Sequence, residues 1–341
     1  MRSSPLDAQA LSLLGLIAER KGDGQAAETL MRIAGARTWR DETTQAWLYD
    51  HYVRRGDYAE ALPHVDAILR VEPESQERLF PVLASLTVKP EAFKALTDFL
   101  ATSPPWRSWF LSELSAKLAN KSRLIELYAA LEKTENPPTK DDLVPYLNRL
   151  VDEGDYAQAY QLWRATLPPG LRTLDTHPFN RDFELPLDGL PFNWVLTEAS
   201  GADIQIVPSP DAGRKRAMRI QFSGSRVAFA NVNQLMLLPP GKYKLSGRVK
   251  AEDLQTSRGL WWRVYCADDP DNVLAHTEPV SGTLPWTDFT VDFEVPAEDC
   301  EAQWLQLQQP ARVASENQIE GQVWYQYLQV SADSGEPPRA Y

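Results

Sequence analysis

The chain has 341 residues, of which 47 are acidic and 35 basic, so its formal net charge is −12. At roughly 150 residues per domain, this length favours two domains. The acidic charge excludes a nucleic-acid binder that works through basic patches, and it disfavours contact with an anionic membrane surface. No apolar run reaches the ~20 residues of a membrane span. Residues 1–5 lack the apolar segment typical of a signal peptide.

The two halves of the chain differ in composition. Residues 1–170 contain 22 alanines and 7 valines, whereas residues 171–341 contain 15 alanines and 13 valines. Alanine favours helices, and β-branched residues favour strands. The sequence Leu-Pro-Pro-Gly at 167–170 is typical of a break between elements. We therefore predict a helical domain over 1–170 and a β-rich domain over 171–341.

A Gly-Asp pair recurs in the first half. Gly22-Asp23 and Gly56-Asp57 lie 34 residues apart, and Gly154-Asp155 follows 98 residues later, close to three more periods. Small residues such as Gly15, Ala27 and Ala61 allow two helices to approach closely, and Gly-Asp suits the turn between them. In the middle of this half the pair is replaced by Lys89-Pro90 and Asn120-Lys121.

This pattern resembles the tetratricopeptide repeat. The resemblance implies an N-terminal α-solenoid of about five helical hairpins over residues 6–167, with a concave groove that binds a protein partner. A rigid stalk without a ligand is the alternative.

The second half contains short alternating segments separated by Gly, Pro and Asp. The predicted strands are residues 218–222, 243–246, 261–266, 289–293, 304–308 and 323–328. Short strands at this spacing favour a β-sandwich or jelly roll. The expected fold class is thus multidomain, with an α-helical array followed by a β-sandwich.

Four motifs in this half resemble jelly-roll carbohydrate-binding modules, the type attached to bacterial glycanases. In order they are NRDFE at 180–184 followed by Trp194, PGKYKLSG at 240–247, GTLPWTDF at 282–289, and GQVWYQYL at 321–328. The likeness covers roughly residues 176–332. It implies a domain that binds a polysaccharide or oligosaccharide.

Many members of that family hold a structural calcium ion with an acidic pair in the last strand. This chain has Gln326 and Tyr327 at those positions, although Glu184 is retained as a calcium candidate. One carboxylate beside neutral amides makes a poor calcium site. The acidic run at 268–272 is a second candidate, but it is typical of a solvated turn. We predict no metal site and no cofactor.

Strand alternation predicts where a sugar would bind. If residues such as Ile220, Val264 and Leu305 face the core, their neighbours face outward. Aromatic rings stack on sugars, and Arg and Gln bond the hydroxyls. The candidate carbohydrate-binding residues are Arg219, Gln221, Trp261, Arg263, Tyr265, Trp304, Gln306 and Gln308. The alternative is that these rings pack against the helical half or a loop.

The chain contains two cysteines, Cys266 and Cys300, and both lie in the predicted sandwich. Such a pair suits a disulfide, and two buried free thiols in a cytoplasmic protein are the alternative. A disulfide, together with the sugar-module resemblance, favours the periplasm or cell surface of a bacterium. The signal or anchor would then lie outside this sequence.

No enzyme signature is present. The sequence lacks H-E-x-x-H and G-x-S-x-G, and the Gly-rich stretch at 22–27 follows a predicted helix rather than a strand. We predict a non-catalytic envelope protein that binds a polysaccharide through the sandwich and a protein through the helical groove. Its arrangement resembles that of bacterial exopolysaccharide-associated proteins. The main alternative is a structural adaptor whose sandwich binds protein and no sugar, and an unusual enzyme is a third.

Overall fold

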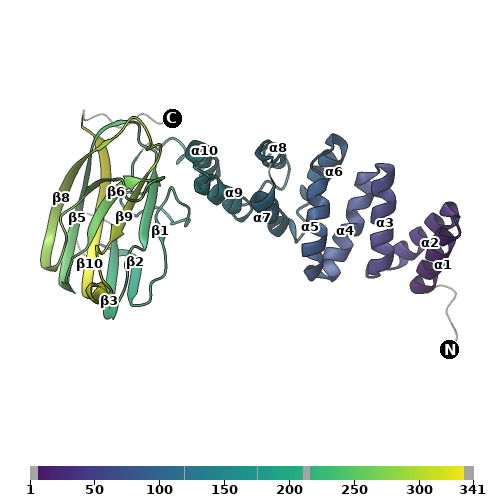
Figure 1. Cartoon of the computed structure of the whole chain (residues 1–341), viewed down its shortest axis with the longest axis horizontal. Helices are drawn as coiled ribbons and strands as arrows, with labels where there is room; N and C mark the ends of the chain where they lie inside the picture. Colours follow the sequence, from purple (N-terminus) through teal and green to yellow (C-terminus); the bar gives the residue numbers. More distant parts are fainter. Residues whose placement is uncertain (1–6, 119, 175, 210–215, 334–341) are drawn as a thin grey trace. The chain divides into compact units, whose positions relative to one another are not determined.

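The computed structural model describes residues 7–118, 120–174, 176–209 and 216–333. Residues 1–5, to which the signal-peptide prediction refers, lie outside this range. Within it, ten α-helices occupy the N-terminal half, and ten strands in two antiparallel sheets follow (Figure 1). The chain divides into two compact units, residues 1–149 and 150–341. The predicted combination of a helical half and a β-sandwich is therefore present.

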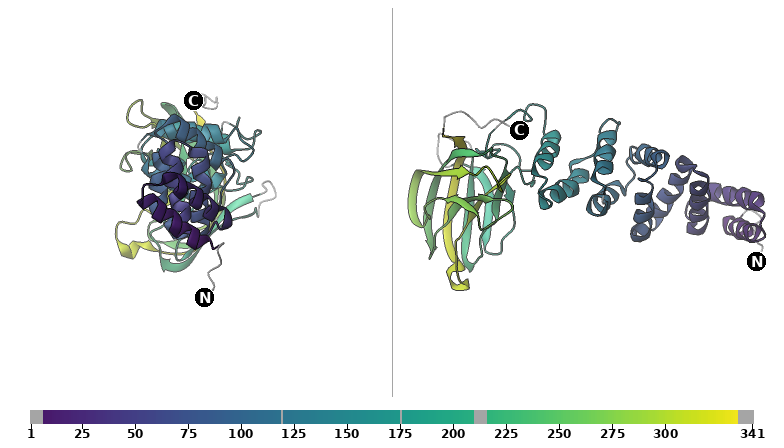
Figure 2. Two further views of the ribbon diagram at one scale, coloured as in Figure 1. Left: turned by 90° about the vertical axis from the view of Figure 1, so that its right-hand side faces the viewer. Right: turned by 45° about the horizontal axis from the view of Figure 1, so that its top comes forward.

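In the first part of the chain, α1 packs against α2 and α3 packs against α4 (Figure 2). The helices are α1 (Ala8–Arg20), α2 (Gly24–Arg37), α3 (Glu42–Arg55), α4 (Tyr58–Val71), α5 (Gln76–Ser85), α6 (Pro90–Leu100), α7 (Arg107–Lys117), α8 (Lys121–Leu131), α9 (Lys140–Asp152) and α10 (Tyr156–Thr166). A short 3-10 helix, η1 (Pro73–Ser75), precedes α5. No helix in the described part of the chain is long and apolar enough to cross a membrane. The solenoid geometry of tetratricopeptide repeats stays a prediction.

The Gly-Asp pairs lie at helix–helix turns. Gly56 ends α3 in the left-handed conformation, with a φ of 80°, which a residue with a side chain adopts at a cost. At the earlier turn, between α1 and α2, the side chain of Asp23 caps the start of α2 by accepting a hydrogen bond from the backbone N–H of Ala26. In the middle of this half Pro90 occupies the first turn of α6, where its missing N–H costs nothing.

Two five-stranded sheets form the sandwich. One sheet, the β6 sheet, has the order β1 (Val195–Leu196), β4 (Val232–Met236), β9 (Gln303–Gln308), β6 (Trp261–Cys266), β7 (Val273–His276). The other, the β10 sheet, has the order β2 (Ala202–Pro208), β3 (Arg216–Arg226), β10 (Gln318–Ala332), β5 (Gly241–Thr256), β8 (Gly282–Val295). A 3-10 helix, η2 (Ala314–Asn317), precedes β10. One apolar core, which includes Trp194, Trp262 and Tyr325, fills the space between the sheets.

The opening motif of the sandwich forms a tight turn. Asn180 has a φ of 55°, and its side-chain amide bonds both the N–H and the C=O of Leu185. The indole N–H of Trp194, which is fully buried, donates to the Asn180 carbonyl at 3.0 Å. A buried glutamine of β4, Gln234, bonds the backbone N–H and C=O of Phe179 and so fixes this segment to the β6 sheet.

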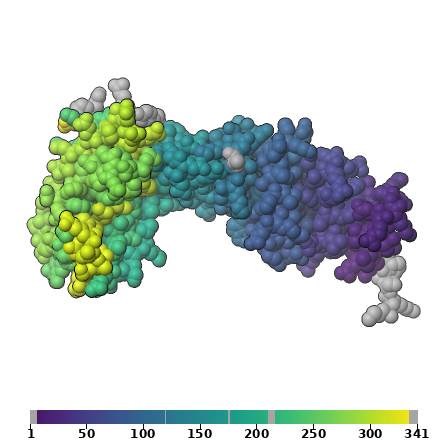
Figure 3. Space-filling model, in the orientation of Figure 1, coloured from purple at the N-terminus to yellow at the C-terminus, as the bar shows by residue number. Residues whose placement is uncertain are grey.

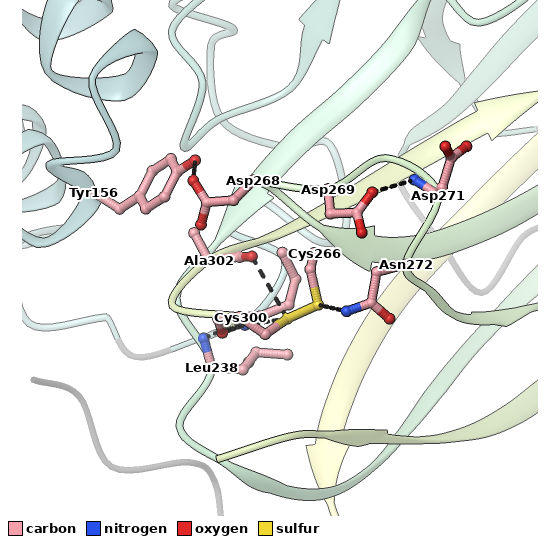
Figure 4. Close-up of a disulfide and its surroundings, with 10 residues drawn as sticks. Tyr156, Leu238, Cys266, Asp268, Asp269, Asp271, Asn272, Cys300 and Ala302 are labelled. Atoms are coloured by element: carbon pink, nitrogen blue, oxygen red, sulfur yellow. Dashed lines mark hydrogen bonds between the residues drawn. A yellow bond between two sulfur atoms is a disulfide. The ribbon is translucent and has the colours of Figure 1, made fainter. Parts of the chain in front are cut away.

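Helix α10 belongs to the same compact unit as the sandwich. Trp163 of α10 is 1% exposed, and its ring meets Phe179 edge-on at 5.0 Å and Phe192 at 5.6 Å. Its indole N–H donates to Asp188. The hydroxyl of Tyr156, at the start of α10, donates to the Asp268 carboxylate at 2.7 Å (Figure 4). Burial, followed by this bond to a carboxylate, raises the pKa of Tyr156, so the hydroxyl keeps its proton.

Substituting Asp268 by alanine should therefore lower the stability of the sandwich unit. The change removes a hydrogen bond to an ionised acceptor and leaves the Tyr156 hydroxyl unpaired, at a cost of about 1–2 kcal/mol. Asp271 lies on the same loop and is exposed, so Asp271→Ala is a matched control that should stay within about 0.5 kcal/mol. Urea unfolding followed by tryptophan fluorescence measures both. Equal stability of the two variants would contradict a role for the Tyr156–Asp268 bond.

Candidate functional site

Six of the predicted carbohydrate-binding residues lie side by side on the outer face of the β6 sheet. In the register of β6 and β9, Trp261 is opposite Gln308, Arg263 is opposite Gln306, and Tyr265 is opposite Trp304. Their strand neighbours Trp262, Val264, Leu305 and Leu307 belong to the core. Alternation along both strands therefore directs all six side chains away from the core.

Three further side chains belong to this face and were not predicted from sequence. Asn233 and Leu235 of β4 pair with Gln306 and Trp304, and His276 of β7 pairs with Arg263. The alternation of Val232 with Asn233 could have indicated β4, but the strand has five residues, two of them amides, so its sequence does not stand out as a strand. We call the nine side chains the β6 face: Asn233, Leu235, Trp261, Arg263, Tyr265, His276, Trp304, Gln306 and Gln308.

The aromatic rings of the β6 face differ in what they contact. Trp261 stacks on His276 with ring centroids 4.0 Å apart, and the guanidinium carbon of Arg263 lies 4.0 Å from the Tyr265 ring centroid. Trp304 is half-buried and makes no ring contact with any other described residue. One aromatic surface on this face is therefore available for stacking on a ligand ring.

Polar groups on the β6 face are incompletely paired. The Nε2 amide of Gln306 donates to Asn233 Oδ1 at 2.6 Å. Trp261 Nε1 and Arg263 Nε have no hydrogen-bond partner among the described residues. Buried donors without partners are costly, so these two N–H groups reduce the stability of the sheet, while the amide pair and the Trp304 ring remain as groups that suit a sugar.

The structure places the other two predicted residues elsewhere. Arg219 and Gln221 lie on β3 in the β10 sheet, and both point away from the core because their neighbour Ile220 is within it. The two outer faces are on opposite sides of the sandwich. Arg219 also contacts Asp203 and Gln205 of β2. Atoms of the segment that contains η2 and β10 are visible in yellow at the surface in Figure 3.

Cys266 and Cys300 form a disulfide, as the sequence predicted. Cys266 ends β6 and Cys300 precedes β9, with their Cα atoms 5.0 Å apart (Figure 4). Gln303, at the start of β9, supports this end of the sheet by donating to the Cys300 carbonyl and accepting from the Leu238 N–H. The bond thus joins the two strands that carry most of the β6 face.

The calcium position implied by the family resemblance does not fit a calcium ion. Gln326 and Tyr327 supply no carboxylate, and the guanidinium carbon of Arg181 lies 4.9 Å from the Tyr327 ring centroid. A cation is therefore already present beside the residue that would have to coordinate calcium. In the described part of the chain, no group of three or more His, Cys, Asp or Glu side chains is arranged to hold a metal. Asp268 accepts a hydrogen bond from Tyr156 of α10, and Asp269 accepts one from the backbone N–H of Asp271.

The helical unit has a groove of its own between α2, α3 and α4. Its volume is about 530 Å³, and its aromatic lining consists of Trp39, Tyr52 and His64. Burial lowers the pKa of His64 to about 4, so the imidazole is neutral at pH 7. Its Nδ1 donates to Gln45 Oε1 at 2.6 Å. The Trp39 side chain is 51% exposed and stacks on His64.

No protein-family model and no curated protein matches the chain. Among solved structures, the C-terminal half is similar in fold to carbohydrate-binding modules. One, described as CBM4 structure and function, is 18% identical over 46% of this chain and 99% of its own, with a TM-score of 0.36. The xylan-binding CBM22-1 domain from Paenibacillus barcinonensis Xyn10C is 12% identical over 47% of this chain and 93% of its own, with a TM-score of 0.30. TmCBM61, in complex with β-1,4-galactotriose, is 15% identical over 46% of this chain and 99% of its own, with a TM-score of 0.31.

Proposed function

We propose that the chain is a non-catalytic glycan-binding protein that holds a polysaccharide on the β6 face. The observation that supports this most directly is the convergence of Trp261, Arg263 and Tyr265 with Trp304, Gln306 and Gln308 on two adjacent strands. Trp304 offers a ring for stacking on the apolar side of a sugar. The glutamine amides offer partners for hydroxyls.

A surface of this kind suits an extended polymer. A sheet face presents its side chains in rows about 4.8 Å apart from strand to strand, which lets several sugar units be contacted in turn. Flat, half-buried aromatic and amide groups lose little conformational entropy when a ligand binds. These properties favour a binding surface over a catalytic cleft, which for glycoside hydrolysis would need two carboxylates flanking the bond.

The wider role that we propose is in the bacterial envelope. The Cys266–Cys300 disulfide favours an oxidising compartment, the periplasm or cell surface. The groove lined by Trp39, Tyr52 and His64 is the proposed site for a protein partner. Polysaccharide binding by one unit and protein binding by the other would suit exopolysaccharide synthesis, modification or export.

The test is binding of the full chain to a panel of bacterial and plant polysaccharides, measured by affinity gel electrophoresis and tryptophan fluorescence. Trp304→Ala should weaken binding at least about tenfold, because it removes about 1.4 kcal/mol or more of stacking and apolar contact. Trp286→Ala is the matched control, since Trp286 is a half-buried tryptophan on β8 of the other sheet. It should leave affinity unchanged.

Failure of the folded wild-type chain to bind any polymer would overturn the proposal. So would equal loss of affinity in Trp304→Ala and Trp286→Ala. Either result would favour the structural adaptor, in which the β6 face contacts protein and binds no sugar.

A further inference from the structure

Arg263 occupies the middle of the β6 face. In the register of the sheet it lies between Gln306 of β9 and His276 of β7. Its guanidinium is stacked on the ring of Tyr265, which is 8% exposed. The ring packs against the guanidinium, and the buried Nε has no hydrogen-bond partner among the described residues.

Three other half-buried arginines of the sandwich have carboxylate partners, whereas the half-buried Arg181 lies over the ring of Tyr327. Arg219 pairs with Asp203 at 3.2 Å, Arg248 with Asp288 at 3.0 Å, and Arg258 with Glu316 at 2.7 Å. Arg263 forms no ion pair with any described residue. A partly desolvated charge without a counter-charge is unfavourable, so this side chain costs stability in the free protein.

The absence of a counter-charge extends over the whole β6 sheet. Its five strands as described contain no Asp or Glu, and Arg263 is their one permanent cation. The β10 sheet differs, since its strands carry seven carboxylates: Asp203, Glu252, Asp253, Asp288, Asp292, Glu294 and Glu320. Within the strands of the β6 sheet, the charge of Arg263 thus has no counter-charge.

We propose that the glycan bound by the β6 face is acidic and that Arg263 binds the carboxylate of its uronic-acid units. This inference rests on the proposed function. A planar carboxylate matches the fork of the guanidinium and accepts two parallel hydrogen bonds from it. Tyr265 packs against the fork, and Gln306 is placed to bond a neighbouring hydroxyl. The incoming carboxylate supplies the counter-charge that the protein lacks.

The experiment uses the full chain with three uronate polymers, polygalacturonate, alginate and hyaluronan. Each is compared with the same polymer after its carboxyl groups are reduced to primary alcohols, so that the linkages are unchanged. Arg263→Gln retains an amide donor and removes the charge. Arg219→Gln is the matched control, because Arg219 is a half-buried arginine on the opposite face. Circular dichroism checks that both variants fold.

The expected result is binding of at least one uronate polymer that weakens at least about tenfold on carboxyl reduction, and equally in Arg263→Gln. Added salt should weaken the same interaction, and Arg219→Gln should bind as the wild type does. Tighter or equal binding of neutral polymers, with Arg263→Gln unchanged, would overturn this inference while leaving glycan binding in place. Binding to no polymer, acidic or neutral, would overturn both.

Discussion

Asp142→Ala should destabilise the helical unit by about 3–5 kcal/mol, the usual cost of removing one partner from a buried ion pair. Asp142 is fully buried and accepts from Arg107 at 2.8 Å, from Ser108 at 2.5 Å, and from the Thr139 backbone N–H at 2.8 Å. These bonds tie α7 to the start of α9. Without the carboxylate, the charge of Arg107, which is 5% exposed, is left buried and unpaired.

Urea unfolding followed by far-UV circular dichroism measures this loss. The matched control is Asp98→Ala, which breaks the exposed Lys94–Asp98 pair and should cost less than about 1 kcal/mol. A similar midpoint for the two variants would show that the buried pair contributes nothing beyond an exposed one.

The effect of Asp142→Ala should also depend on pH. Burial acts to raise the pKa of Asp142, but hydrogen bonds from Ser108 and Thr139 and the charge of Arg107 together hold it below its ordinary value. A carboxylate with a lowered folded-state pKa contributes stability above its ordinary pKa of about 4 and loses it as the pH falls through the folded value. The difference between wild type and variant should therefore be full at neutral pH and shrink in acid.

Loss of the Cys266–Cys300 disulfide should destabilise the sandwich by a comparable amount. The bond closes a loop with a sequence separation of 34. Loop-closure entropy for this length corresponds to about 4 kcal/mol. The double variant Cys266→Ala, Cys300→Ala should therefore unfold at a lower urea concentration than the oxidised wild type, with tryptophan fluorescence as the measurement.

The control for this prediction is reductant. Dithiothreitol should lower the wild-type midpoint toward that of the double variant and leave the double variant unchanged. An unchanged wild-type midpoint, with loss of the disulfide verified by thiol titration, would contradict the prediction.

Strand periodicity was sufficient to predict that the six residues of β6 and β9 face outward, because alternation on these strands is fixed by apolar neighbours such as Val264 and Leu305. It could not assign Arg219 and Gln221 to a sheet. Alternation predicts that a side chain faces outward, but the choice between two sheets depends on pairing with distant strands. Here Ile220 of β3 pairs with Val323 of β10, about a hundred residues later.

In the helical half, the sequence predicted the position of α10 but not the residues against which it packs. The Gly154-Asp155 turn predicted a helix at the position of α10, and that helix is present. Its packing partners could not be predicted, since Phe179 and Phe192 lie beyond the Pro-Pro-Gly break and carry no local signal. The disulfide was easier to predict, because the chain offers one possible pair.

The packing of Trp163 against Phe179 and Phe192 determines where the sandwich can be separated from the rest of the chain when domains are recombined. A segment exchanged from residue 171 onward would separate these rings and leave two phenylalanines in water. The smallest inheritable module is the sandwich together with α10. A fusion of this module to another chain should therefore begin before α10. That boundary lies inside the alanine-rich part of the sequence.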